Sequence, residues 1–136
     1  MQNENLTFKI IGCAFKVHNA LGAGFLEKVY ENALRMELVD AGLKVQQQVP
    51  IHVRYRGQIV GEYFADLFVE DHVIVEIKAV RKLAPEHEVQ LVHYLTATGL
   101  EIGLLINFGT SVEYKRKHKT YLLKNQSSAN DDSAAP

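Results

Sequence analysis

Residues 65–80, ADLFVEDHVIVEIKAV, constrain the fold more than any other part of the chain. They read as two apolar strands joined by a short polar turn, which is the pattern of a hairpin buried in a core. Buried strands seldom carry charge, yet this hairpin holds Asp66, Glu76 and Lys78. A fold for this chain therefore has to explain three ionisable side chains at one end of a core hairpin.

The register of the hairpin decides whether these charges meet. Side chains alternate between the two faces of a strand. With a turn at residues 70–72, Val69 lies opposite Val73, and counting back places Asp66 opposite Glu76. Three-residue loops are common in hairpins, although this one lacks the usual glycine. A slip of one residue would move Asp66 to the wrong face, so this register is an inference from the pattern.

In this register, two carboxylates and an amine converge. Adjacent carboxylates repel and are costly to desolvate unless a positive group lies between them. A hard divalent cation with oxygen ligands would meet that need, and Lys78 would add a donor for a water or an anionic oxygen. Such a cluster suits phosphodiester hydrolysis. The alternative is a structural ion pair of Lys78 with Glu76 or Asp66, and the hairpin alone favours neither interpretation.

The rest of the chain predicts helices and strands in the order α-α-β-β-β-α-β. Apolar residues at helical spacing predict a helix over residues 6–19. Its apolar stripe comprises Ile10, Ala14, Val17 and Leu21, widened by Ile11 and Phe15. A second helix is predicted over residues 25–41, with the face Leu26, Val29, Ala33 and Met36. The remaining elements are strands at 49–55 and 59–69, the opening hairpin, a helix at 86–98, a strand at 102–108 and a possible short strand at 112–117. Pro50 predicts that the strand at 49–55 lies at a sheet edge.

Length and composition suit one domain in a reducing compartment. The 136 residues predict a single domain over residues 1–124 and a disordered polar tail over 125–136. No apolar run reaches the roughly 18 residues of a membrane span, and the N-terminus lacks a signal-peptide pattern. The single Cys13, which reads as a core residue, excludes an internal disulfide. We therefore expect a cytoplasmic protein without membrane contact. The net charge of −1 leaves any nucleic-acid binding to local patches, for which Arg81 is one candidate.

Two further motifs favour the catalytic interpretation. In GFLEKVY (24–30), Glu27 lies in the first turn of the predicted second helix, and Tyr30 follows three residues later on the same side. In QLVHY (90–94), Gln90 and Tyr94 project from one helix face and could reach a phosphate, a base edge or a metal-bound water. Taken alone, each motif is also consistent with ordinary structural residues.

Together these motifs resemble a known family over residues 8–121. GFLEKVY matches the pattern that names the GxxExxY protein family, and the AD, VEIK, HEVQLVHYL and GLLINFG segments follow in the expected order. That family is part of the PD-(D/E)XK nuclease superfamily. The resemblance implies a mixed α/β (α+β) fold, with a restriction-endonuclease-like core and a mixed central sheet flanked by helices. It departs from the superfamily in having Ala65 before Asp66, where a proline is typical. His18 is only a weak counterpart of the upstream histidine of RecB-type nucleases.

The resemblance also implies roles for individual residues. Asp66, Glu76 and the peptide carbonyl of Ile77 would bind Mg²⁺ or Mn²⁺, and Lys78 would be the catalytic lysine. Glu27 would complete the metal shell and the catalytic set. The accessory nucleic-acid contacts would come from Gln90, Tyr94, Tyr30 and Arg81.

The function expected from these roles is divalent-metal-dependent cleavage of nucleic acid, more likely DNA than RNA. The alternatives are a non-catalytic nucleic-acid-binding or assembly module that keeps the fold and, less favoured, a metal-binding stress or toxin-like protein acting on RNA. Such a small chain also leaves open a homodimer or a partner protein that supplies specificity.

Overall fold

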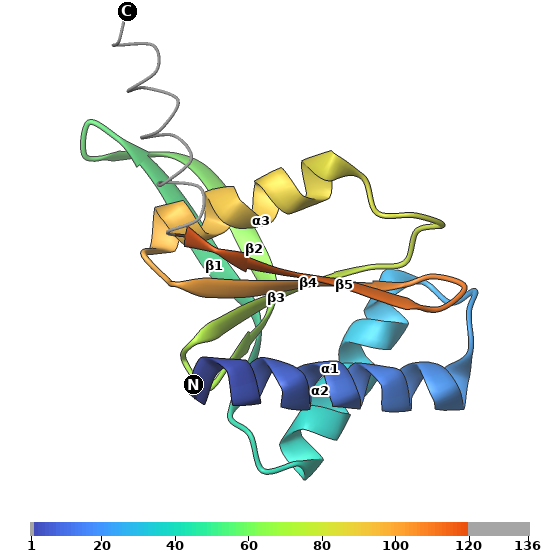
Figure 1. Cartoon of the computed structure of the whole chain (residues 1–136). Coiled ribbons are helices and arrows are strands. Elements are labelled where there is room, and N and C mark those ends of the chain that lie inside the picture. Colours follow the sequence, from blue (N-terminus) through green and yellow to red (C-terminus); the bar gives the residue numbers. More distant parts are fainter. Residues whose placement is uncertain (1, 120–136) are drawn as a thin grey trace, which may run out of the picture.

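The computed structural model describes residues 2–119, which form three helices and five strands (Figure 1). Their bounds are α1 Gln2–Leu21, α2 Glu27–Asp40, β1 Val45–Tyr55, β2 Gln58–Val69, β3 Val73–Lys78, α3 Pro85–Thr98, β4 Ile102–Phe108 and β5 Val112–His118. The predicted element order is confirmed, including the short last strand. Within residues 2–119, no helix is both long and apolar enough to cross a membrane. The predicted tail at 125–136 lies outside the described residues.

The five strands form one mixed sheet in the order β1-β2-β3-β4-β5. All neighbouring strands are antiparallel except β3 and β4, which run parallel and are connected through α3. A parallel connection of this kind requires a crossover, and a helix usually supplies it. The edge position predicted from Pro50 is confirmed, because β1 lies at one edge of the sheet.

Helices cover both faces of the sheet (Figure 1). Helices α1 and α2 pack on one face, and their buried residues form a core with the odd-numbered residues Val73, Val75 and Ile77 of β3. Helix α3 packs on the other face, where Leu91 and Leu95 form a second core cluster with residues that include Ile74, Ala65 and Leu105. Strands β3 and β4 are therefore covered on both sides, which explains why they read as nearly continuous apolar runs.

The predicted buried face is confirmed for the middle of α1 and is mostly wrong for α2. Ile10, Ile11, Ala14 and Val17 of α1 are almost fully buried, and Cys13 lies in the same core, but Leu21 and Phe15 are exposed. Of the face predicted for the second helix, Leu26, Val29 and Met36 are exposed, and only Ala33 packs against the core. The buried residues of α2 are Tyr30, Glu31, Leu34 and Leu38. After the turn at residues 22–26, α2 is rotated about its axis, so that a different face packs on the sheet from the one that the number of apolar residues suggested. This rotation carries an acidic side chain into the interior.

The turn between β2 and β3 has the predicted length, and Val69 pairs with Val73. Glu70 and Asp71 both adopt positive φ (54° each), a conformation in which glycine is usual. Lys44 stabilises it, because its backbone N–H donates to Glu70 Oε2 (2.6 Å) and its Nζ pairs with Asp71 Oδ2 (2.8 Å). Side-chain bonds thus replace the missing glycine and keep the hairpin in register.

A buried amide fixes the chain where β3 ends. Asn107 of β4 has no exposed surface. Its Nδ2 donates to the carbonyl of Val80 (2.9 Å), and its Oδ1 accepts from the N–H of Val80 (2.9 Å). Backbone approaches closely here, since a Cβ on Gly109 would lie 2.9 Å from the Val80 oxygen. The last residue of β3 that pairs with β4 is Lys78. Through Asn107, β4 therefore also fixes Val80, two residues further along the chain.

Candidate active site

Asp66 and Glu76 interlock at the point where β2 leaves β3. The paired residues of the two strands end at Leu67 and Val75, one position before the two acids. The backbone N–H of Asp66 donates to Glu76 Oε2 (3.1 Å), and Asp66 Oδ2 accepts from the N–H of Ile77 (2.8 Å). Each carboxylate therefore holds the backbone of the other strand, so that the carboxylates take the place of the next ladder bonds.

The surroundings of the acid pair disfavour its ionised form. Burial, and then the charge of Asp66, raise the pKa of Glu76 to about 8, although Lys78 acts in the opposite direction. Burial also raises the pKa of Asp66, against the hydrogen bond from the Ile77 N–H, and the charge of Glu31 adds to the rise. Both shifts favour the protonated acids, which is the electrostatic signature of carboxylates that lack a cation.

Lys78 lies two residues after Glu76 on β3 and is half-buried. Among the described ion pairs, none joins Lys78 to Asp66 or Glu76. The structural ion pair weighed from the sequence is therefore not formed in this structure. Lys78 influences the site through its field, which lowers the pKa of Glu76.

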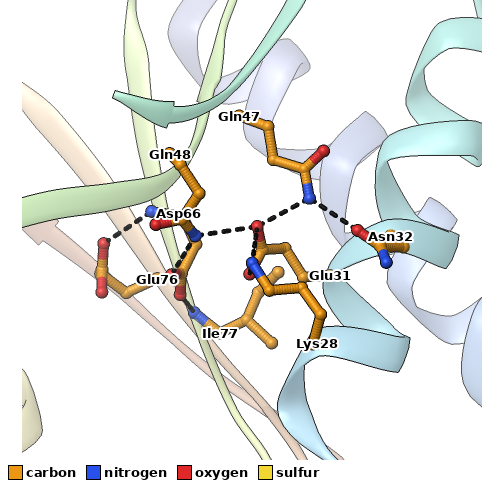
Figure 2. A network of polar contacts seen from close by, with 8 residues as sticks. All are labelled: Lys28, Glu31, Asn32, Gln47, Gln48, Asp66, Glu76 and Ile77. Carbon is orange, nitrogen blue, oxygen red and sulfur yellow. Dashed lines mark hydrogen bonds and ion pairs between the residues drawn. The ribbon is translucent and has the colours of Figure 1, made fainter. Parts of the chain in front are cut away.

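Glu31 of α2 is the acidic residue that the sequence interpretation missed (Figure 2). Its side chain is 3% exposed. Lys28 pairs with Glu31 Oε1 (3.1 Å), and the amides of Gln47 and Gln48 donate to Oε2 (2.7 and 2.9 Å). The Gln48 amide also donates to Asp66 Oδ1 (3.2 Å), so one side chain bridges the carboxylates of α2 and β2.

The backbone of Gln48, whose side chain bonds to Glu31 and Asp66, has an unusual conformation. Its φ is +55°, in the left-handed region that residues other than glycine rarely occupy. Holding such a residue costs about 1–3 kcal/mol, and surrounding contacts must supply it. The two hydrogen bonds of the Gln48 amide to Glu31 and Asp66 supply part of this stabilisation.

The two motif residues of α2 occupy different surroundings. Glu27, the first residue of the helix, is exposed, and its charge is the smallest of the causes that raise the pKa of Asp66. Tyr30 is fully buried and stacks on Phe108 (ring centroids 4.6 Å apart). Its hydroxyl donates to the Gly22 carbonyl (2.6 Å) and accepts from the N–H of Phe25 (3.2 Å). These contacts place Tyr30 in the core, closing the glycine turn, and not on a surface that nucleic acid would reach.

The α3 motif lies on the face of the sheet opposite to the face that α2 covers. Tyr94 is 6% exposed and belongs to the core cluster of Ala65, the neighbour of Asp66. Burial, and then the charge of Glu76, raise the pKa of Tyr94 to about 12, while a hydrogen bond with Gln90 lowers it. Gln90 is thus hydrogen-bonded to a tyrosine whose hydroxyl lies in the field of both acids. Arg81 is exposed in the segment after β3. His18 bonds to the Gly109 carbonyl (2.8 Å) through Nε2, in a structural position.

The donor types at this site fit a divalent metal ion. Asp66, Glu76 and the Ile77 carbonyl offer hard oxygen atoms, as Mg²⁺ and Mn²⁺ prefer. The pKa values of both acids are raised, so a bound cation would stabilise their ionised forms. In their present orientation, however, no three His, Cys, Asp or Glu side chains within the described residues gather closely enough to hold a metal. In this orientation, Glu76 accepts from the Asp66 N–H, and Asp66 accepts from the Ile77 N–H and from the Gln48 amide.

A mixed sheet with two acids and a lysine at the end of a buried hairpin is the architecture of metal-dependent nucleases as a class. The family model described as PD-(D/E)XK nuclease superfamily matches residues 4–119. The chain therefore belongs to the PD-(D/E)XK nuclease superfamily. A comparison with curated proteins gives no match.

Solved structures of two proteins share the fold. An alkaline exonuclease (LHK-Exo) from Laribacter hongkongensis superposes with a TM-score of 0.54 at 15% identity, covering 78% of this chain and 62% of its own. The structure of SSO0001 superposes with a TM-score of 0.51 at 18% identity, covering 68% and 49%. The chain thus spans less than two thirds of either protein. These similarities confirm the predicted restriction-endonuclease-like fold.

Proposed function

We propose that this protein hydrolyses phosphodiester bonds of nucleic acid, with DNA as the substrate and Mg²⁺ or Mn²⁺ as cofactor. One observation carries the proposal: the buried Glu76 and the half-buried Asp66 are hydrogen-bonded to each other's strand, with no ion-pair partner among the described residues, and Lys78 follows two residues after Glu76. Isolated buried acids of this kind are unfavourable for stability, and sites of this kind cluster where chemistry is done. Membership in a nuclease superfamily supports the same conclusion.

The proposed roles are those that the resemblance to PD-(D/E)XK nucleases implies. Asp66, Glu76 and the Ile77 carbonyl hold the metal, which when bound lowers the pKa of a water and neutralises phosphate charge. Lys78 orients the attacking water or stabilises the charge that develops on the phosphate oxygens. Gln90 and Tyr94 position the substrate beside the acids, and Arg81 contacts a phosphate from its exposed segment.

The third acidic group comes from α2. The sequence motif nominates Glu27, and the structure adds Glu31, which Gln48 connects to Asp66. We propose that Glu31 acts directly on the metal shell and that Glu27 contributes through its negative field. We also propose, from the GFLEKVY segment, that the chain belongs to the GxxExxY family within its superfamily.

A non-catalytic nucleic-acid-binding module is the second candidate. It is favoured by the orientation of the acids, since no three metal-binding side chains of the described residues converge. In that case, the amide of Gln48 would be a permanent partner of Asp66 and Glu31. In either case, a homodimer or a partner protein would supply sequence specificity.

Incubation with single- and double-stranded DNA and RNA, with and without Mg²⁺ or Mn²⁺, tests the proposal. We expect metal-dependent cleavage by the wild-type protein and none by Asp66→Asn, which keeps the size of the side chain. Binding of nucleic acid without cleavage under every metal condition would favour the second candidate.

A further inference from the structure

A groove of about 960 Å³ lies between α3 and the β1–β2 hairpin. Its walls include His52, Arg54 and Tyr63 from the hairpin, and Gln90, His93 and Tyr94 from the helix. The volume is at the upper end of the roughly 300–1,000 Å³ that protein sites use for small molecules. It forms because β2 pairs with β3 only as far as Leu67, so that the earlier part of β2 continues with β1 alone.

An aromatic pair forms part of the groove. The rings of Tyr63 and Tyr94 lie 5.5 Å apart at an interplanar angle of 43°. Tyr94 is buried, whereas Tyr63 is 44% exposed. Tyr63 is therefore supported from behind by a fixed ring and presents aromatic surface to solvent. A protein gains nothing in stability from such exposure, and exposed apolar surface beside a cavity is typical of binding sites.

Tyr94 connects the groove with the surroundings of the acid pair. Tyr94 lines the groove and also belongs to the core cluster that contains Ala65, the neighbour of Asp66, and Ile74, which lies two residues before Glu76 on β3. The charges of Glu76 and Asp66 both reach its hydroxyl, since both contribute to the raised pKa of Tyr94. A ligand in the groove would thus end next to the site proposed for hydrolysis.

The charges on the walls indicate which part of a nucleic acid fits. Arg54 and Glu86 bring opposite charges to the lining, and none of the lysines within residues 2–119 lines it. His52 is already paired with Glu62 (2.8 Å). A phosphate backbone requires clusters of lysine and arginine, which these walls lack. Bases need an aromatic face and a few hydrogen-bonding groups at their edges, and Tyr63, Gln90 and His93 offer both.

We propose that this groove binds unpaired bases of the substrate strand, with Tyr63 as the stacking surface, and so delivers a single strand to the acid pair. The proposal rests on the nuclease function proposed above and names its substrate class. Inside a duplex, both faces of a base are covered by its neighbours, so a base reaches Tyr63 only after it has left the stack. The groove therefore selects single strands and frayed ends over intact duplex.

Binding without metal tests the groove independently of cleavage. The probes are a short single strand containing 2-aminopurine, in deoxy and ribo forms, and the matched duplex, all in EDTA. We expect Tyr63→Ala to weaken single-strand binding about 5- to 100-fold, the effect of losing one stacked base, and to abolish the quenching of 2-aminopurine fluorescence. Tyr63→Phe should restore both. Tyr55→Ala, at an exposed tyrosine outside the groove, should bind as the wild type does.

The possible results separate this proposal from the proposed function. Equal affinity of wild type and Tyr63→Ala for single strands, with an unchanged melting temperature, would overturn the groove even where metal-dependent cleavage is observed. Quenching that depends on Tyr63, in a protein that cleaves nothing, would support the groove and reject the hydrolytic function. Loss of binding in Tyr55→Ala as large as in Tyr63→Ala would also overturn the groove, because contact would then spread along the whole hairpin. Tyr63-dependent binding of the ribo strand supports base stacking equally well.

Discussion

The metal-free protein should become less stable as the pH rises, and Glu76 is the reason. Its pKa is about 8 in the folded state, compared with an ordinary value of 4.5. Between these two pH values, the folded protein retains a proton that the unfolded chain releases. Stability therefore falls across this window, and the contribution of Glu76 is level below it and above it. The raised pKa of Asp66 acts in the same direction.

The expected size follows from proton counting. A difference of one bound proton changes the free energy of unfolding by about 1.4 kcal/mol per pH unit. For a domain of this length, that corresponds to a fall in melting temperature of roughly 5 °C per pH unit. Saturating Mg²⁺ should reverse the trend, because the metal binds the ionised acids and competes with their protons.

Urea unfolding in EDTA between about pH 5 and about pH 7.5 measures the slope. Glu76→Gln should remove about one proton's share of it, and Glu101→Gln, the same change at an exposed position, should leave the slope as in the wild type. The comparison between variants cancels the titration of the histidines. Stability that rises with pH, or a slope that survives in Glu76→Gln, would refute the picture of a protonated buried acid.

Three further predictions concern the site and the core. Lys78→Ala should lower the cleavage rate about a hundredfold at an unchanged melting temperature; an unchanged rate with a lower melting temperature would make Lys78 structural. In calorimetric titration with Mn²⁺, Glu31→Gln should weaken binding about tenfold or more and Glu27→Gln less; the reverse order would return the metal-shell role to Glu27. Gly103→Ala should lose about 1–3 kcal/mol of unfolding free energy in urea, because its Cβ would lie 2.8 Å from Cδ1 of Leu91; wild-type stability would show that Leu91 moves aside at no cost.

The hairpin could be predicted from sequence because its signals are local and agree. Two apolar strands joined by a three-residue polar loop pair Val69 with Val73, and this register is the one observed. The strand at 102–108 was equally clear, since a strand covered on both faces is apolar throughout. The conformation of the turn could not be predicted locally, because Lys44, which stabilises it, lies outside the hairpin.

The site was harder to predict because it depends on how α2 is rotated. Counting apolar residues favoured Leu26, Val29 and Met36, all of which are exposed. The spacing of Tyr30, Leu34 and Leu38, each four residues apart, was the better signal, and it would have placed Glu31 beside the buried stripe. No sequence pattern announces the positive φ of Gln48, since tertiary contacts impose that conformation.

The two hydrogen bonds between Asn107 and Val80 make the conformation of β3 independent of the segment that follows it. Because one buried amide occupies both hydrogen-bonding groups of Val80, a change in chain length after this point is not transmitted back to Lys78. The exposed Lys82 lies between this fixed point and Leu83, which packs against the second core cluster, and is consequently a place where a peptide can be inserted.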